Sequence, residues 1–131
     1  MEKSPGPDRK KIHLGRRGEE LAAAFLEQQG IDIIARNVRT PYGELDLVGR
    51  SSLEEIIFFE VKTRTGAGFG YPEEAVHRKK RIHLYQSALF YINEMTETGI
   101  DWRIDVIAVY QNPEMKKPDF HWIENAVTEP E

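Results

Sequence analysis

The chain has 131 residues, a formal net charge of −4, 40% hydrophobic residues and no cysteine. This length and composition favour one domain with a hydrophobic core, and the lack of cysteine excludes a disulfide framework and a thiolate metal site. No apolar run approaches the roughly 18 residues of a membrane-spanning helix, and the first residues lack the apolar stretch of a secretory signal. We therefore expect a cytoplasmic protein that does not bind membranes.

The first residues carry Pro5, Gly6, Pro7 and several charges, a composition typical of a disordered lead-in. Nothing in the remaining sequence indicates an internal repeat or a second domain. The sequence therefore predicts a disordered N-terminal arm over residues 1–12, one domain over residues 13–126 and an acidic tail over residues 127–131.

Helical and strand patterns follow one another along this domain. The expected elements are a helix over 15–29 stopped by Gly30, strands over 31–38, 44–49 and 55–64, a helix from about 73 or 78 to about 98 ended by Gly99, a strand over 102–110 and an edge strand over 119–127. A short turn-rich connection separates the second and third strands, which favours a hairpin, and the fourth strand is apolar on both faces, as interior strands are. This order predicts an α/β sandwich around one mixed sheet.

The long second helix and the segment before it carry further signals. Apolar residues recur in this helix at three- and four-residue steps, which predicts one apolar stripe of Ile82, Tyr85, Leu89, Ile92 and Met95. Residues 65–72 are predicted to form a loop, in which Phe69 and Tyr71 are either base or sugar contacts or plain turn residues.

Charged residues interrupt the third strand, "IIFFEVKTR". Glu60, Lys62 and Arg64 stand at every second position, so their side chains share one face of the strand. The four apolar residues before them indicate a strand covered on both sides. Because desolvation of a charge is costly, Glu60 and Lys62 need partners or a water-filled edge of the sheet.

Asp46 poses the same problem on the neighbouring strand, where it stands between two leucines. If the two strands form a hairpin, Asp46 lies near Glu60 across the ladder. Two carboxylates in one place repel each other unless a cation lies between them. Lys62 would serve, and a divalent ion such as Mg²⁺, which prefers oxygen ligands, would serve better. The alternative is a structural ion-pair triad of Asp46, Glu60 and Lys62.

Glu19 is a third candidate acid, on the first helix. At about 100° per residue it projects near Ala22, Ala23 and Leu26, which border the apolar face, whereas Glu20 lies on the more polar side. Glu19 therefore points toward the sheet and the other carboxylates. The alternative is a surface acid that the positive end of the helix dipole favours.

Asp46, followed after thirteen residues by Glu60-Val61-Lys62, resembles the PD-(D/E)xK nuclease signature. The stretches "GRRGEELAAAFLEQQG", "RNVRTPYGELDLV", "FFEVKTR", "AVHRKKRIHLYQSALFYI" and "WRIDVIAVY" together resemble the YraN family, small bacterial proteins related to archaeal Holliday-junction resolvases. This resemblance implies a restriction-endonuclease-like α/β fold, with a central mixed sheet flanked by helices in the order α-β-β-β-α-β and a possible extra edge strand.

The same resemblance implies roles for individual residues. Asp46 and Glu60 would bind Mg²⁺ or Mn²⁺, with the carbonyl of Val61 and the carboxylate of Glu19 as further ligands. Lys62 would orient the attacking water and stabilise charge on the scissile phosphate. Leu45 stands where the signature often has proline, a minor departure.

Nucleic-acid contacts are expected from basic residues near this cluster. Arg64 is next on the strand face of Lys62 and is either a phosphate ligand or a surface residue. The run Arg78-Lys79-Lys80-Arg81 opens the long helix, where positive charge opposes the helix dipole, so it is either a phosphate site or a solvated helix end. The predicted nucleic-acid contacts are Arg64, Arg78, Lys79 and Lys80.

The expected function is metal-dependent hydrolysis of phosphodiester bonds in DNA, with branched, recombination or repair intermediates as candidate substrates. A homodimer is expected by analogy with resolvases, which cut two strands symmetrically. Two alternatives stay open from the sequence: a nucleic-acid-binding protein of the same fold with weak or no catalysis, and a structural protein in which the charged cluster is an ion-pair network.

Overall fold

The computed structural model describes residues 9–64, 77–111, 114 and 116–130. Its elements are α1 (Arg9–Gln28), β1 (Asp32–Thr40), β2 (Gly43–Arg50), β3 (Ile56–Arg64), α2 (Arg78–Glu94), β4 (Trp102–Tyr110) and β5 (Asp119–Val127). Residues 1–8 of the predicted arm and the predicted loop with Phe69 and Tyr71 lie outside the described residues. Among the helices described, none has the length and apolar character that crossing a membrane requires.

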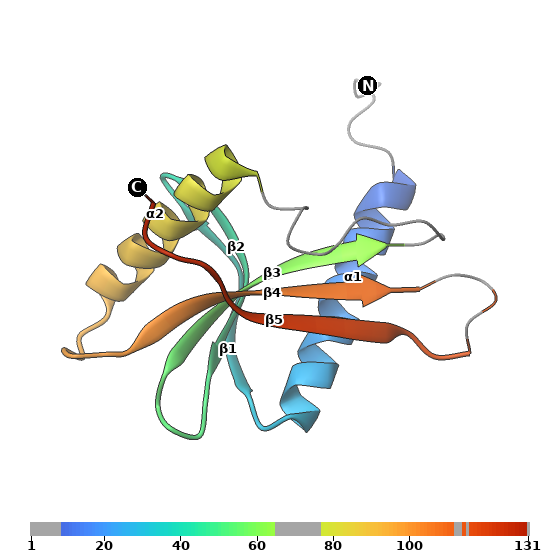
Figure 1. The fold of residues 1–131 in the computed structure, drawn as a ribbon, viewed down its shortest axis with the longest axis horizontal. Helices are drawn as coiled ribbons and strands as arrows, with labels where there is room; N and C mark the ends of the chain where they lie inside the picture. Colours follow the sequence, from blue (N-terminus) through green and yellow to red (C-terminus); the bar gives the residue numbers. More distant parts are fainter. Residues whose placement is uncertain (1–8, 65–76, 112–113, 115, 131) are drawn as a thin grey trace, which may run out of the picture.

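One five-stranded sheet in the order β1-β2-β3-β4-β5 forms the centre of the molecule (Figure 1). Its pairs are antiparallel except for β3 and β4, which run parallel. The connection between β3 and β4 contains α2, as a parallel crossover needs. The predicted β2–β3 hairpin, interior β4 and edge strand β5 are confirmed, and with them the predicted α/β class with a central mixed sheet flanked by helices.

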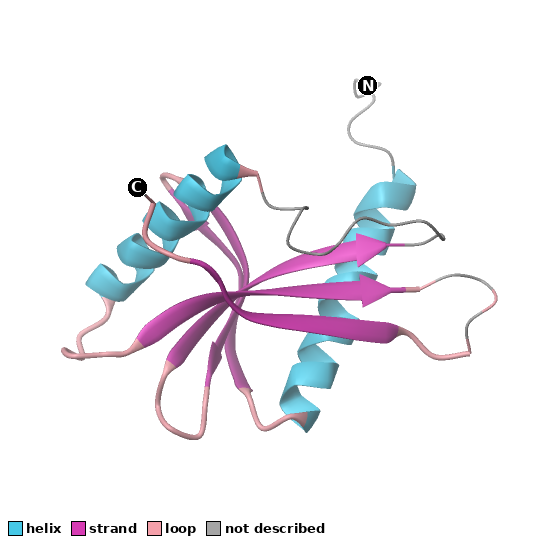
Figure 2. Cartoon of the chain, viewed as in Figure 1, coloured by secondary structure: helices cyan, strands magenta, loops and turns pink. Residues whose placement is uncertain are grey.

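The two helices cover opposite faces of the sheet and divide the core in two (Figure 2). Alternate residues of β3 point to alternate faces: Ile57 and Phe59 pack in the core with α1, whereas Ile56 and Phe58 pack in the core with α2. This alternation follows from the period of two in a strand. Both faces of β3 are therefore buried along its first half. This confirms the prediction made from its four apolar residues at the start of the strand.

Helix α1 begins at Arg9, six residues before the predicted start at Gly15, so residues 9–12 are helical and do not belong to a disordered arm. The sequence contains no proline in this stretch, and the glycines at 15 and 18 do not end the helix. Gly18 has a packing reason to be glycine, because a Cβ there would collide with Oγ1 of Thr63 on β3. At the other end, Val127 is buried in the core, so the domain includes it.

Helix α2 differs from its prediction at its end and on its buried face. It ends at Glu94 rather than at Gly99, because Met95 already has an extended backbone (φ −77°, ψ 144°). Its buried residues are Leu84, Ser87 and Ala88, while the stripe member Leu89 is exposed. The predicted stripe is therefore confirmed in part: Tyr85, Ile92 and Met95 pack against the core on this side of the sheet, but the most buried residues of the helix lie beside the stripe.

The tip of the β1–β2 hairpin lies beside α2 (Figure 1). The hydroxyls of Thr40 and Ser87 are hydrogen-bonded with 2.9 Å between their Oγ atoms, and the rings of Tyr42 and Phe90 meet edge-on. These contacts join the hairpin to the helix, while β3, β4 and β5 extend away from it. The sheet consequently opens between β2 and β3 beyond their paired residues.

Candidate active site

The backbone ladder between β2 and β3 ends at the pair Leu47–Phe59. One residue further on, Asp46 and Glu60 stand on the two separating strands. There the N–H of Val61 donates to Oδ2 of Asp46 at 2.9 Å. The Asp46 carboxylate thus satisfies the backbone of β3 at the opening, and its position near Glu60 is the one predicted from the hairpin.

An irregularity in β1 accompanies this opening. Arg36 pairs with Leu47 and Val38 with Leu45, which places Asn37 opposite Asp46. Asn37 has a positive φ of 50°, in the left-handed region that asparagine tolerates better than most residues. The strict alternation of the strands is interrupted at this level, and Leu45 packs in the same core as Val48 instead of the opposite one.

Glu60 is the most buried acid of the cluster, with its side chain 4% exposed. Two lysines approach its Oε2: Lys80 Nζ at 3.3 Å and Lys62 Nζ at 3.9 Å. Within the described part of the chain, however, this oxygen accepts no hydrogen bond. Glu60 therefore retains a buried acceptor that is balanced by charge but is not coordinated by a donor.

Burial and the neighbouring Glu60 raise the pKa of Asp46 to about 8, against the lowering effect of its hydrogen bond from Val61. Burial also raises the pKa of Glu19, and the charges of Glu44 and Glu60 add to the rise. Like charges in a poorly solvated place favour protonation unless a cation compensates them. These carboxyls therefore bind a proton or a positive ion more readily than surface acids do.

The side chain of Asn37 connects Glu19 to a fourth acid, Glu44. With its amide nitrogen turned toward the carboxylates, Asn37 donates to Oε1 of Glu19 at 3.0 Å and to Oε1 of Glu44 at 3.3 Å. The predicted inward orientation of Glu19 is confirmed, because it is partly buried while Glu20 is exposed. Sequence reasoning did not assign Asn37 or Glu44 to the site, although Glu44 stands two positions before Asp46 on the same strand.

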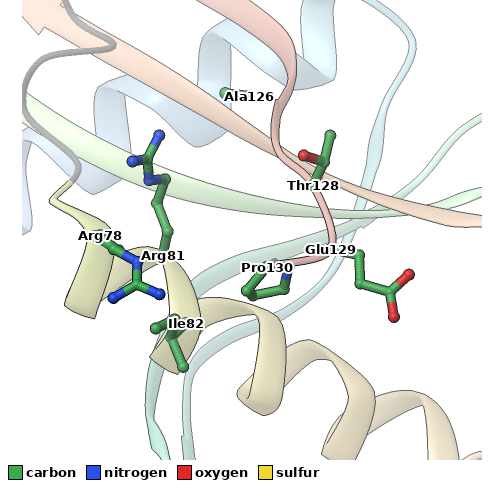
Figure 3. A pocket seen from close by; sticks show the side chains of 7 residues that line it. All are labelled: Arg78, Arg81, Ile82, Ala126, Thr128, Glu129 and Pro130. Carbon is green, nitrogen blue, oxygen red and sulfur yellow. The ribbon is translucent and has the colours of Figure 1, made fainter.

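The predicted basic contacts separate into different places. Lys80 reaches Glu60, Lys79 is exposed, and Arg64 at the end of β3 donates through Nη1 to the Thr63 carbonyl at 3.2 Å. Arg78 instead lines a separate cavity of about 380 Å³, together with Arg81, Ile82, Ala126, Thr128, Glu129 and Pro130. Figure 3 shows both arginines extending from the start of α2, opposite the segment that follows β5.

A metal ion would find only part of a coordination shell in this arrangement. Across the described ranges, no three acidic or histidine side chains are placed to hold one together. The pair Asp46 and Glu60 nevertheless offers hard oxygen donors, and the Glu60 oxygen without a hydrogen bond is one of them. The donor set thus fits Mg²⁺ or Mn²⁺ in chemical type.

Residues 18–109 match the model of the uncharacterised protein family UPF0102. The chain belongs to this family. It is 46% identical over 99 residues to the UPF0102 protein of Syntrophotalea carbinolica, an alignment that covers 76% of this chain and 80% of the relative. It is also 38% identical over 116 residues to the UPF0102 protein of Caldicellulosiruptor saccharolyticus, covering 88% and 98%. The resemblance to the YraN family is thereby confirmed.

Solved structures give more distant matches. The EndoMS–dsDNA2 complex matches with a TM-score of 0.44 and 15% identity, and a repair endonuclease from Pyrococcus abyssi with 0.37 and 16%; each match covers 87% of this chain. In both cases this chain spans only 42% of the solved chain. Pyrococcus furiosus SfsA in complex with Ca²⁺ matches with a TM-score of 0.38 and 14% identity, covering 98% and 76%.

Proposed function

We propose that this protein is a metal-dependent endonuclease that hydrolyses phosphodiester bonds in DNA. The observation that carries the proposal is the convergence of Asp46 and Glu60 at the opening between β2 and β3, with Lys62 Nζ 3.9 Å from Glu60. A buried carboxylate beside a partly buried one is unfavourable for stability alone. A site that binds a cation beside a phosphate gives this arrangement a use.

Asp46 and Glu60 would hold Mg²⁺ or Mn²⁺, with the Val61 carbonyl and Glu19 completing the protein ligands. When bound, such an ion lowers the pKa of a coordinated water and neutralises phosphate charge. The hydrogen bond from Val61 fixes one oxygen of Asp46, so this carboxylate is held in position before any ion arrives.

Lys62 follows Glu60 on the same face of β3 and is 24% exposed, so its ammonium group can meet both the carboxylate and an incoming phosphate. We assign it the orientation of the attacking water and the stabilisation of negative charge as the phosphodiester is attacked. Arg64, the next residue on that face, would hold an adjacent phosphate. Arg78 and Lys79, at the start of α2, would contact the DNA backbone further along.

Branched DNA or repair intermediates are the substrate class that we propose, with a homodimer placing two sites on two strands. Cleavage of labelled junction, flap, duplex and single-stranded DNA with Mg²⁺ or Mn²⁺ tests this directly. We expect the wild-type protein to cut at least one of them, and Lys62→Met to lower the rate by about 100-fold or more. Asp46→Asn should abolish cleavage.

The matched control is Lys116→Met, which removes an exposed lysine outside the cluster and should cut at the wild-type rate. If the wild type cleaves no substrate with either metal, the enzymatic proposal is wrong. Equal rates for wild type and Lys62→Met would overturn the role of Lys62, and equal rates in Asp46→Asn as well would mean that a contaminating nuclease cut the DNA.

A second candidate function is nucleic-acid binding without cleavage. The observation that favours it is that the described residues hold no complete set of three metal-ligating side chains. This function predicts DNA binding that weakens steeply with salt and is unaffected by Asp46→Asn. A thermal-shift titration with Mn²⁺ separates the two: a shift in the wild type that is lost in Glu60→Gln favours the endonuclease.

A further inference from the structure

Four consecutive cations open α2, and they differ in what they contact. Lys80 Nζ lies 3.3 Å from Oε2 of buried Glu60, closer than the motif residue Lys62. Within the described residues, Arg78, Lys79 and Arg81 form no ion pair. Lys80 is therefore the member of this run that is directed at the carboxylates rather than at solvent or the neighbouring cavity.

The position of Lys80 is unfavourable in every respect except this contact. It lies in the first helical turn, where the helix dipole opposes positive charge, and this turn has no acidic residue and no side-chain cap. Its two sequence neighbours, Lys79 and Arg81, are also cationic. Among the described residues, the ion pair with Glu60 compensates Lys80 for the unfavourable helix dipole and the neighbouring positive charges.

The contact is also of a kind that can be exchanged. Glu60 is almost fully buried, whereas the Lys80 side chain is 42% exposed and flexible, and Oε2 accepts no hydrogen bond from it. A lysine that pairs by charge alone can rotate into water at small cost. By contrast, Lys62 is anchored on β3 beside Glu60 and is less exposed.

We propose that Lys80 is an exchangeable counter-cation: it neutralises Glu60 in the metal-free protein, leaves when a divalent ion binds there, and then contacts a DNA phosphate. This inference rests on the proposed function, because it takes Glu60 as a metal ligand. It makes metal binding and phosphate binding cooperative, since each favours the same displaced position of Lys80.

Calorimetric titration of the purified protein with Mg²⁺, without DNA, tests the proposal. Lys80→Met removes the competing cation, and we expect Mg²⁺ to bind about tenfold more tightly. Lys79→Met is the matched control, because it removes the same charge from the same turn but not the contact with Glu60. The titrations belong at about pH 9, where protons compete least with the metal for carboxylates. Lys80→Gln is a second variant that removes the charge. A melting curve for each variant shows whether it is folded.

The outcomes separate this inference from the function on which it rests. Tighter binding in both Lys80 variants, with Lys79→Met unchanged, supports the exchange. If the wild type binds Mg²⁺ and the Lys80 variants bind it equally or more weakly, the counter-cation role is wrong while the metal site stands. An equal gain in Lys79→Met would reduce the effect to general charge and overturn the proposal. If no variant binds Mg²⁺, and a repeat with Mn²⁺ also shows no binding, both the inference and the metal-dependent function fail.

Discussion

The N–H of Val61 donates to Oδ2 of Asp46 across the first gap in the β2–β3 ladder, at 2.9 Å. From Leu47 to Arg50 the two strands of this hairpin pair through backbone groups. Here the Asp46 side chain accepts the hydrogen bond instead of a backbone carbonyl, and this position brings its carboxylate beside Glu60. The opening of the sheet and the juxtaposition of the two acids are therefore parts of one local structure.

The raised pKa of Asp46 makes the stability of the metal-free protein depend on pH. Its pKa rises from 3.8 to about 8 on folding, so the folded protein binds more protons than the unfolded chain between these values. Stability must then fall as pH rises from about 4 to about 8. Urea unfolding across this range in a chelator should show the decline, and Asp46→Asn should reduce its slope. An unchanged slope in Asp46→Asn would assign the dependence to other groups.

Gly18→Ala should destabilise the protein by about 1–3 kcal/mol, because the new methyl group overpacks against Thr63. The higher helix propensity of alanine offsets a fraction of about 1 kcal/mol of this loss. Overpacking is expected to prevail, because the new Cβ would overlap Oγ1 of a short, stiff side chain. Chemical denaturation measures the change. The double variant Gly18→Ala/Thr63→Ala should recover most of the loss relative to Thr63→Ala alone. A stable single variant would show that α1 can shift on the sheet.

Asp105 is fully buried and accepts hydrogen bonds from Arg103 Nε at 3.0 Å, Trp122 Nε1 at 2.8 Å and the Asn125 N–H at 2.8 Å. Asp105→Asn keeps the shape but removes the charge and presents an amide donor to these donors. We expect a loss of about 2–4 kcal/mol in the free energy of unfolding. Exposed Asp101→Asn is the control and should change stability little. Mg²⁺ affinity should be the same in both variants, since Asp105 serves β4 and β5 rather than the carboxylate cluster.

Arg78→Gln should weaken DNA binding without changing its sequence or structure preference. A residue that contacts one phosphate contributes about one to the slope of log K against log salt concentration. The slope measured by fluorescence anisotropy should therefore fall by about one. Lys116→Gln should leave it unchanged. A wild-type slope in Arg78→Gln would mean that its cavity faces away from the bound DNA.

Much of the candidate site follows from the sequence because it depends on local rules. Period two places Glu60 and Lys62 on one face, a hairpin brings Asp46 opposite Glu60, and helical geometry turns Glu19 inward. The role of Lys80 depends on how α2 docks against the sheet, which no pattern within the helix fixes. The same docking buries Ser87 and Ala88, which the predicted apolar stripe did not include.

Asn37 escaped prediction for a different reason. A single residue with positive φ interrupts the alternation of β1, and asparagine only permits this conformation without requiring it. The start of α1 was misplaced because the prolines and glycine of residues 5–7 and the charges beside them were interpreted as a disordered lead-in up to residue 12. The close approach of Gly18 to Thr63 on β3 could not be predicted either, because such a contact exists only once helix and sheet are packed together.

The hydrogen bond between Thr40 and Ser87 has a mechanical consequence for the carboxylates. It couples the hairpin that carries Asp46 to the helix that carries Lys80, while Glu60 belongs to β3. A tilt of the hairpin relative to β3 would then move Asp46 and Lys80 together relative to Glu60. The contact at the tip of the hairpin therefore influences the site from a distance. Thr40→Val would change the distances among Asp46, Glu60 and Lys80, although Thr40 contacts none of them.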